Sequence, residues 1–476
     1  MNLVQKTIHS VSWTLGGRQI QQLATLVITA ILAKLLDPED FGLMGMVTVL
    51  SGMAMILADT GFSAAVIQRD NLTQTHYSTL FWINLAIGIA VSVLFYLSAP
   101  WIAAFYQRPE LIPISQVLAL TFTLSALSSI PQALLRRVMR FKRLTIIDTA
   151  VHLVTGVTVV AMAIKGYGIW ALVAQPLLQQ GLKLVLMWWY CPWRPSLTVS
   201  IPALKDVFRF SANILGLQYL QYFMNNLDYL LVGRFLGAEA LGYYTLAYKL
   251  MFVPIRNICQ EIVKVLFPAL SRLQDDPAAL LRGLAKALRS TCYIVFPMLM
   301  GMFMVADVFI ESIFGERWYP TIAVLQVLCL VGLVQSVITV LSVGFRAVGS
   351  PERELRIHLA RLLVMTLALL TAIPFGLTPF TWTLFGVTAL FLTVYLGSVA
   401  RLLGGRVAPL LSAMWPALVI SLLMTLCLWG VRALLGQWAI GSVNALVVLI
   451  LSGVALYGAG IAILWLYYRR MDQSFI

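Results

Sequence analysis

The sequence predicts an all-α polytopic membrane protein, and its composition, its apolar runs and an internal repeat support this prediction. Of the 476 residues, 60% are hydrophobic and only 11% are charged, which excludes an ordinary soluble protein. Apolar runs of about 20 residues, the length at which a helix crosses roughly 30 Å of hydrocarbon, recur along the whole chain. A transmembrane β-barrel would instead show alternating segments of about ten residues. The spanning elements are therefore expected to be helices.

Hydropathy, interrupted by clusters of charge, glycine and proline, predicts about fourteen transmembrane helices. The predicted spans are 11–35, 40–66, 79–104, 112–134, 145–165, 168–190, 211–235, 240–268, 287–310, 321–345, 357–375, 380–402, 413–435 and 442–468.

The basic residues of the loops predict the topology. With the N-terminus in the cytoplasm, 22 of the 33 Lys and Arg residues lie in cytoplasmic loops or near the cytoplasmic ends of spans, 6 lie in outer loops or near the outer ends of spans, and 5 are counted as within spans. The opposite orientation would invert this distribution, against the positive-inside rule. We therefore expect both termini to be cytoplasmic and every outward loop to be short. The net charge of +14 comes from these basic loops, so no nucleic-acid partner is expected.

A repeat with an offset of about 200 residues indicates two related halves. The stretch AKLLDPEDFGLMGM (33–46) returns as GRFLGAEALGYYTL (233–246). The matched pairs are Lys34 and Arg234, Leu36 and Leu236, Glu39 and Glu239, Gly42 and Gly242, and later Arg136 and Arg346, and Trp170 and Trp382. Six predicted spans separate the copies, so both halves have the same orientation and are related by an axis along the membrane normal.

This repeat predicts three parts of the chain. They are an N-lobe of six spans (1–200), a C-lobe of six spans (201–410) and an extra pair of C-terminal helices (411–476). The segment DPEDFG is an outward hairpin between the first two spans, and GAEALG is its counterpart in the second lobe. Asp37, Glu39 and Asp40 are expected at a helix N-terminus, where the helix dipole favours acids.

Polar residues on one helical face mark candidate cavity-lining positions, because an ionised side chain at the centre of a span costs about 2.5–3.5 kcal/mol. The first span carries such a stripe at intervals of four, three and four residues. Its members are Arg18, Gln22, Thr25 and Thr29. The equivalent positions of the seventh span, 200 residues later, are Gln218, Tyr222, Asn225 and Tyr229. We predict that both stripes face a cavity.

The eighth span carries a cationic stripe and a proline that is expected to bend it, Pro254. The stripe consists of Lys249, Arg256, Gln260 and Lys264, at intervals of seven, four and four. Lys264 lies near the inner end of its span, where snorkelling to the membrane surface is the simpler explanation. Lys249 and Arg256, like Arg18, lie deeper and are predicted to face a cavity.

Acidic residues within the spans have two open interpretations. Asp59, Asp228 and Glu261 are candidate counter-ions to the cavity cations or, together with Asp307, candidate sites for a coupling ion. His152 is either a proton-relay residue or a side chain that satisfies a neighbour.

Catalysis is not expected, nor is a cofactor or a bound metal. The sequence contains no GxxxxGK[ST] phosphate-binding loop and no HExxH metal motif. The five cysteines, at positions 191, 259, 292, 329 and 427, occur singly and read as small apolar residues. Movement of a substrate across the membrane is therefore the default expectation.

Five segments, taken in order, closely resemble the polysaccharide flippase family of the multidrug/oligosaccharidyl-lipid/polysaccharide exporter superfamily. They are KLLDPEDFGLMGMVTVL, DTGFSAAVIQRDN, QALLRRVMRFKRL, NNLDYLLVGRFLGAEALGYYTLAYKLM and VLFPALSRLQDDP. Within the family the sequence is most similar to the colanic-acid and teichuronic-acid exporters. The resemblance covers roughly residues 1–410.

The resemblance implies a V-shaped transporter like the MATE multidrug exporters, with two six-helix lobes around a cavity lined chiefly by spans 1, 2, 7 and 8. It implies that an undecaprenyl-pyrophosphate-linked oligosaccharide is moved to the periplasmic leaflet of the bacterial inner membrane by alternating access, for exopolysaccharide, capsule or lipopolysaccharide biosynthesis. Arg18, Lys249 and Arg256 would meet the pyrophosphate or acidic sugars. Membrane lipid and a polysaccharide polymerase or co-polymerase are expected partners of a monomeric protein.

Two alternatives stay open. A cation-coupled multidrug exporter of the same superfamily would depend on an acid in the first lobe, for which Asp59 is the candidate. A membrane glycosyltransferase or polymer ligase would need a catalytic acid or a sizeable outward loop.

Overall fold

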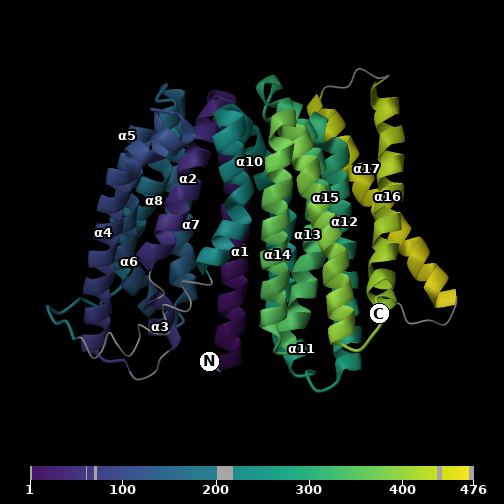
Figure 1. Cartoon of the computed structure of the whole chain (residues 1–476), viewed down its shortest axis with the longest axis horizontal. Coiled ribbons are helices and arrows are strands. Elements are labelled where there is room, and N and C mark those ends of the chain that lie inside the picture. The colour runs from purple at the N-terminus through teal and green to yellow at the C-terminus, as the bar shows by residue number, and fades with distance from the viewer. Residues whose placement is uncertain (1–2, 60–61, 69–71, 201–217, 437–441, 471–476) are drawn as a thin grey trace. The chain divides into compact units, whose positions relative to one another are not determined.

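The computed structural model describes residues 3–59, 62–68, 72–200, 218–436 and 442–470 (Figure 1). For some of these, residues 3–15 and Asp59 among them, only the backbone is described. Within these ranges every regular element is a helix. The predicted all-α fold is therefore confirmed.

Eleven helical segments of the described chain are long and apolar enough to cross a membrane. They are formed by α2 (Pro38–Asp59), α4 (Gln74–Tyr106), α5 (Leu111–Leu118) with α6 (Leu120–Arg137), α7 (Phe141–Ile164), α8 (Ile169–Tyr190), α12 (Pro277–Ile313), α13 (Pro320–Ala347), α14 (Pro351–Ala372) with η4 (Ile373–Phe375), α15 (Leu377–Leu402), α16 (Ala408–Gly436) and α17 (Ser442–Arg470). They coincide with predicted spans 2–6 and 9–14, so the chain is a multi-pass membrane protein.

The other three predicted spans also coincide with helices, and the number fourteen holds as an approximation. Span 11–35 lies in α1 (Leu3–Leu35). Of span 211–235, residues 218–235 lie in helical residues 218–231 and the π-helix η1 (Val232–Leu236), and residues 211–217 lie outside the described residues. Span 240–268 is α10 (Gly237–Pro254), the π-helix η2 (Ile255–Cys259) and α11 (Gln260–Ser271). Two short helices, α3 (Phe62–Gln68) and η3 (Glu316–Trp318), complete the fold.

The π-helical turn η2 begins directly after Pro254. Proline has no N–H to donate and its ring clashes with the preceding turn, so a regular α-helix cannot pass through it unchanged. A π-turn widens the helix locally while its backbone groups stay hydrogen-bonded. The sequence predicts a bend at Pro254, and the structure has a π-helical turn there, which contains Arg256.

Two helices start well before the predicted boundary because their caps were not recognised. Asp276 Oδ1 accepts a hydrogen bond from Ala279 N at 2.9 Å, and Pro277 occupies the first turn of α12, ten residues before the predicted start at 287. Likewise α14 starts at Pro351, after Ser350. Both helices therefore begin with residues that hydropathy alone treats as loop.

The chain consists of two compact units, Met1–Gly242 and Tyr243–Ile476. The boundary falls within α10, whereas the sequence places a division at residue 200. The three-part division at residues 200 and 410 stays a prediction.

In the first unit, α1 packs along α7 by close backbone approach. A Cβ atom added to Gly17 would lie 2.1 Å from Thr145 Cγ2, and one added to Gly156 would lie 2.1 Å from Ile28 Cδ1. Between these two points, Gln21 Nε2 donates to Thr149 Oγ1 at 2.9 Å. Small residues that allow close approach, with polar bonds between the helices, are the usual means of association in lipid.

The segment that leaves α8 is bound to the start of α4. Trp82 Nε1 donates to the carbonyl of Ser196 at 2.8 Å, and the Ser196 amide donates to Ser78 Oγ at 2.9 Å. Trp193 Nε1 donates to Gln74 Oε1 at 2.7 Å. Residues 191–200 form no helix or strand, and these hydrogen bonds hold the segment against α4.

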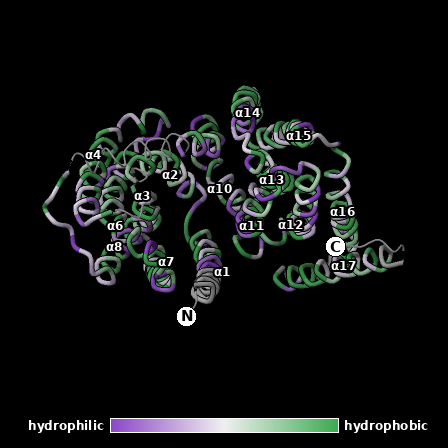
Figure 2. Tube along the Cα trace, turned by 90° about the horizontal axis from the view of Figure 1, so that it is seen from below, coloured by the Kyte–Doolittle hydropathy of each residue, from purple (hydrophilic) through white to green (hydrophobic). Residues whose placement is uncertain are grey.

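In the second unit, α13 is the central helix, packed by α12, α14, α15 and α11. Most of its side chains are buried. By contrast, α17 is largely hydrophobic along its length (Figure 2), and Val443, Leu451 and Val454 are 60%, 63% and 69% exposed. Since apolar side chains of a spanning helix can face lipid without cost, this exposure indicates a lipid-facing helix.

We expect Gly17→Leu to destabilise the first unit, because its side chain would force α1 away from Thr145. Overpacking of this kind costs about 1–3 kcal/mol. Thermal unfolding of the purified protein, followed by tryptophan fluorescence, should show a lower midpoint. Gly181→Leu is the matched control, because a Cβ at Gly181 meets nothing within 4 Å. Equal midpoints for the two variants would contradict the assigned helix contact.

Candidate functional site

Helical residues 218–231 place a polar pocket of about 280 Å³ against α2 in the first unit. Its lining consists of Ile56, Gln218, Gln221, Tyr222, Asn225 and Asn226. Three of these, Gln218, Tyr222 and Asn225, are predicted cavity residues, and the structure brings them to one place.

Two tyrosines fix this wall to α2. Tyr222 Oη donates to the carbonyl of Val49 at 2.9 Å, and Tyr219 Oη donates to that of Met53 at 2.7 Å. The Tyr222 ring passes so close to Gly52 that a Cβ there would lie 2.0 Å from Oη. Tyr222 therefore serves to position the wall.

The exposed amides of Gln218, Gln221 and Asn225 supply the polar surface of the pocket. Asn226 Nδ2 donates within its own helix, to the carbonyl of Tyr222 at 2.8 Å. Each amide offers both donors and an acceptor. Such a surface suits hydroxyl-rich or phosphate-bearing ligands, which need several hydrogen bonds at once.

The predicted stripe on α1 divides into different environments. Arg18 is exposed, and Gln22 is partly buried with an Nε2 atom that has no hydrogen-bond partner among the described residues. Thr25 Oγ1 donates to the carbonyl of Gln21 at 2.7 Å and lies 3.0 Å from His152 Nε2. The hydroxyl of Thr25 is thus engaged between α1 and α7. His152 is predicted to be either a proton-relay residue or a hydrogen-bond partner of a neighbouring side chain, and its contact with Thr25 agrees with the second interpretation.

The cationic stripe of the second unit crosses three consecutive elements. Lys249 lies on α10, Arg256 in η2 and Gln260 at the first residue of α11, and all three are exposed. An exposed ionised side chain in a spanning helix is costly against hydrocarbon, so such residues face water-filled space or bundle interiors. The exposure of Lys249 and Arg256 therefore agrees with the predicted cavity role, which stays a prediction.

Two of the candidate acids, Glu261 and Asp307, form ion pairs. Glu261 Oε1 lies 2.6 Å from Lys264 Nζ, one turn along α11. Lys264 thus has an ion-pair partner in addition to its predicted snorkelling. Asp228 is buried and its Oδ1 accepts from the Tyr229 amide at 3.0 Å. Asp307 forms an ion pair with Arg432. The side chain of Asp59 lies outside the described residues.

Sequence reasoning missed a polar junction in the second unit. Arg361 is partly buried on α14, and its two terminal nitrogens each donate to Gln335 Oε1 of α13 at 3.2 Å. One of them also lies 3.4 Å from Thr388 Oγ1 of α15. The predicted span 357–375 contains Arg361, but no partner is predicted for it. The helix-start signal Ser350-Pro351-Glu352 would have placed Arg361 ten residues after the start of the helix.

A second group that was not predicted lies closer to the N-terminal end of α14. Arg346 donates from Nε to Glu354 Oε2 at 3.0 Å and from Nη2 to Oε1 at 2.9 Å. His358 Nε2 lies 3.5 Å from the same carboxylate, and both His358 ring nitrogens lie 3.1 Å from Tyr395 Oη. This network ties α13, α14 and α15 together.

The two copies of the repeated turn contact each other. A Cβ at Gly42 would lie 1.6 Å from the carbonyl oxygen of Ala238, and one at Gly242 would lie 1.9 Å from that of Pro38. The contact is reciprocal in repeat positions, because Gly42 corresponds to Gly242 and Pro38 to Ala238. Only glycine fits at both places.

The acidic residues of the segment DPEDFG lie at the N-terminus of α2, as predicted. Glu39 and Asp40 lie in the first turn of α2, and Asp40 Oδ2 lies 3.4 Å from the amide of Asp37. Arg108 Nη1 pairs with Glu39 Oε1 at 2.9 Å. Both partners of this pair are solvent-exposed, so its contribution to stability is small.

Known proteins resemble this chain in sequence and in fold. A family described as "Polysaccharide biosynthesis protein" matches residues 31–323. The teichuronic acid biosynthesis protein TuaB of Bacillus subtilis (strain 168) is 30% identical over 70% of this chain and 70% of its own. The lipopolysaccharide biosynthesis protein WzxC of Escherichia coli (strain K12) is 31% identical over 71% of this chain and 69% of its own.

Two solved structures have the same fold. The lipid II flippase MurJ in an inward closed conformation matches with a TM-score of 0.75, at 13% identity, over 98% of this chain and all of the other. An inward-facing multidrug resistance MATE family transporter of the MOP superfamily matches with a TM-score of 0.61, at 14% identity. The match covers 80% of this chain and 95% of the transporter. The expected MATE-like fold and the resemblance seen in five sequence segments are thereby confirmed.

We expect Arg361→Met to destabilise the second unit by about 1–3 kcal/mol, because it leaves Gln335 Oε1 and Thr388 without a donor inside the helix bundle. The measurement is the thermal unfolding midpoint. Arg356→Met is the matched control on the same helix, since Arg356 is exposed and its only hydrogen bond within the described part of the chain is to the Glu352 carbonyl, at 3.5 Å. A midpoint for Arg361→Met as high as that of the control would show that the junction has no stabilising role.

Proposed function

We propose a flippase function, from the premise that this chain belongs to the polysaccharide biosynthesis protein family. The cargo would be an undecaprenyl-pyrophosphate-linked oligosaccharide repeat unit, moved from the cytoplasmic to the periplasmic leaflet of the inner membrane for the biosynthesis of a surface polysaccharide. Relatives named for teichuronic acid and lipopolysaccharide biosynthesis support this assignment, as does the fold of a lipid II flippase. The protein acts as a transporter and catalyses no bond change.

The proposal rests mainly on exposed cations within helices that the sequence predicts to span the membrane. Arg18 in the first unit and Lys249 and Arg256 in the second are all exposed. A diphosphate that leaves water loses its hydration, and fixed cations compensate for part of that loss. Arg256 and Lys249 are therefore the residues that would hold the pyrophosphate, and Arg18 would do so from the first lobe.

The amide-lined pocket would receive the sugars. Gln218, Gln221 and Asn225 offer donors and acceptors without net charge. Sugar hydroxyls need such partners, and a neutral amide surface releases its ligand more readily than a charged one. The lipid tail need not enter this pocket, because it can stay in the bilayer while the head group crosses.

Alternating access would require the repeated turns to separate. In the described state the turns touch through Gly42 and Gly242. With both termini in the cytoplasm, these turns lie on the periplasmic side, so their contact would close that side. Release of the head group would then need the lobes 1–200 and 201–410 to rock apart there, with transfer of the product to a polymerase or co-polymerase.

The multidrug exporter is the second candidate, because MATE transporters share the fold. It differs in cargo and in coupling, since it would use an ion bound by an acid such as Asp59 and would leave surface polysaccharide intact when deleted. The exposed cation stripe favours the anionic cargo of the first proposal.

We expect Arg256→Ala to reduce exported polymer by at least about tenfold, since about 1.4 kcal/mol of lost phosphate binding already gives that factor. Lipid-linked intermediate should accumulate on the cytoplasmic leaflet. Arg256→Lys should retain part of the export, and Arg353→Ala, which removes an exposed cation at the start of α14, should retain all of it. The readouts are immunoblots of surface polymer and extraction of labelled lipid-linked sugars.

Unchanged export in both Arg256→Ala and Arg18→Ala would refute the cationic cavity. A deletion strain with intact surface polysaccharide, and with dye efflux that depends on Asp59, would instead establish the multidrug exporter.

We expect Gly42→Ala to open the turn contact, because its methyl group cannot fit beside the Ala238 carbonyl. A cysteine introduced at Ala238, which is 0% exposed, should then react several-fold faster with a water-soluble maleimide. The background carries Cys427→Ser, and the buried Cys259, Cys292 and Cys329 report any unfolding. Faster labelling at 238 with these three still protected supports the opening, whereas equal labelling in both backgrounds would exclude it.

A further inference from the structure

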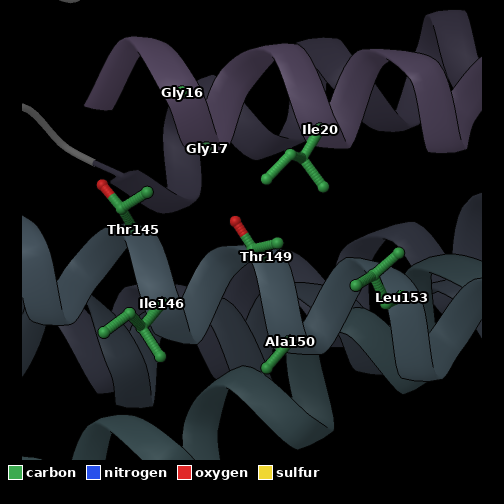
Figure 3. A pocket seen from close by; sticks show the side chains of 8 residues that line it. All are labelled: Gly16, Gly17, Ile20, Thr145, Ile146, Thr149, Ala150 and Leu153. Atoms are coloured by element: carbon green, nitrogen blue, oxygen red, sulfur yellow. The ribbon is translucent and has the colours of Figure 1, made fainter. Parts of the chain in front are cut away.

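A groove of about 470 Å³ lies between α1 and α7 in the first unit, apart from the amide-lined pocket (Figure 3). Its lining consists of Gly16, Gly17, Ile20, Thr145, Ile146, Thr149, Ala150 and Leu153. From Thr145 to Leu153 it follows α7 over eight residues, which at 1.5 Å per residue is about 12 Å. The size falls in the range of roughly 300–1,000 Å³ that is usual for ligand sites.

The walls of the groove are apolar and open to the surroundings. Ile20, Ile146 and Leu153 are 52%, 48% and 41% exposed. The hydroxyl of Thr149 already accepts a hydrogen bond from Gln21. These walls belong to spanning helices, so they favour a hydrocarbon chain over water.

The two glycines of α1 have different tasks at this groove. Gly17 is needed for contact, because a Cβ there would lie 2.1 Å from Thr145 Cγ2. At Gly16 a Cβ would meet nothing within 4 Å. The missing side chain of Gly16 therefore leaves space that the packing of α1 against α7 does not require.

Exposed cations lie at one end of the groove, which the predicted topology places on the cytoplasmic side. Lys142 and Arg143 are exposed at the start of α7, and Arg140 is exposed directly before it. Lys142 precedes Thr145, Ile146 and Thr149 by three, four and seven residues, and Arg143 precedes Ile146 and Ala150 by three and seven. These intervals put both cations on the helix face that lines the groove. The apolar groove thus continues into a positively charged mouth.

We propose that the groove binds one acyl chain of an anionic phospholipid of the cytoplasmic leaflet, with the lipid phosphate at Lys142 and Arg143. An acyl chain of one leaflet has to cover about 15 Å, half of the hydrocarbon core, which matches the length of the groove. The undecaprenyl chain of the cargo is several times longer than the groove. Basic residues at the cytoplasmic surface attract anionic lipids. This inference does not depend on the proposed flippase function.

The test compares lipid binding to the purified full chain by native mass spectrometry. Phosphatidylglycerol and phosphatidylcholine with the same acyl chains are added separately at equal concentration. The wild type should retain one phosphatidylglycerol at least about fivefold more than phosphatidylcholine.

The variants test the two parts of the site separately. Gly16→Leu, which fills the groove, should lose this bound lipid. The double variant Lys142→Gln with Arg143→Gln should lose the preference for phosphatidylglycerol. Gly181→Leu and the pair Arg353→Gln with Arg356→Gln are the matched controls and should behave as the wild type does.

A second measurement uses only the wild-type chain and stays valid if a variant fails to fold. Phosphatidylglycerol with a photoreactive acyl chain should cross-link to residues 16–20 and 145–153. Cross-links confined to other helices would overturn the proposal, as would equal retention of the two lipids by the wild type. Complete displacement of phosphatidylglycerol by undecaprenyl phosphate at equal concentration would identify the wrong occupant and would also overturn it.

Discussion

The constraint on which this structure depends is that a backbone N–H or C=O group in hydrocarbon must be hydrogen-bonded within the protein. An unsatisfied group costs several kcal/mol there, so the chain meets the constraint with helices throughout its described spans. Even the interruption after Pro254 is a π-helical turn and not a loop. This keeps the backbone bonded at the position where Arg256 is presented, so the cation stripe stands on a continuous though irregular helix.

Once every span is a helix, close packing between helices decides what each face can do. Gly17 and Gly156 let α1 lie against α7, and Gly42 and Gly242 let the two repeated turns touch through their backbones. Hydrophobic burial gives little discrimination between helices in lipid, so shape and interhelical hydrogen bonds decide the pairing. In the first unit these contacts leave two spaces of different character, one lined by amides and one by methyl groups. The amide-lined space is suited to a sugar head group, and the apolar space to a lipid chain.

The charged residues of this chain occur both on exposed helix faces and in polar contacts between side chains. Arg18, Lys249 and Arg256 are exposed on helices that the sequence predicts to span the membrane, and their role in a cavity stays a prediction. Arg361 lies within the predicted span 357–375, but its contacts with Gln335 and Thr388 are not predicted, because they depend on how α13, α14 and α15 pack. Glu261 and Lys264 are predicted to have separate roles, but they form an ion pair at one-turn spacing. This second contact would be expected if residues one turn apart were considered together.

The sequence by itself determined that this is a membrane protein, and it determined the repeated turn and the family. It also located eleven of the spans, and most of their ends were predicted to within a few residues. Each of these depends on local composition or on order along the chain, which a single sequence contains. Only the tertiary structure decided that Thr25 meets His152, that Tyr222 is bound to the backbone of α2, and that Gly16 borders open space whereas Gly17 borders Thr145. The physical reason is that these outcomes depend on the rotation and spacing of helices distant in sequence. Neighbouring glycines have identical chemistry until a second helix packs against one of them.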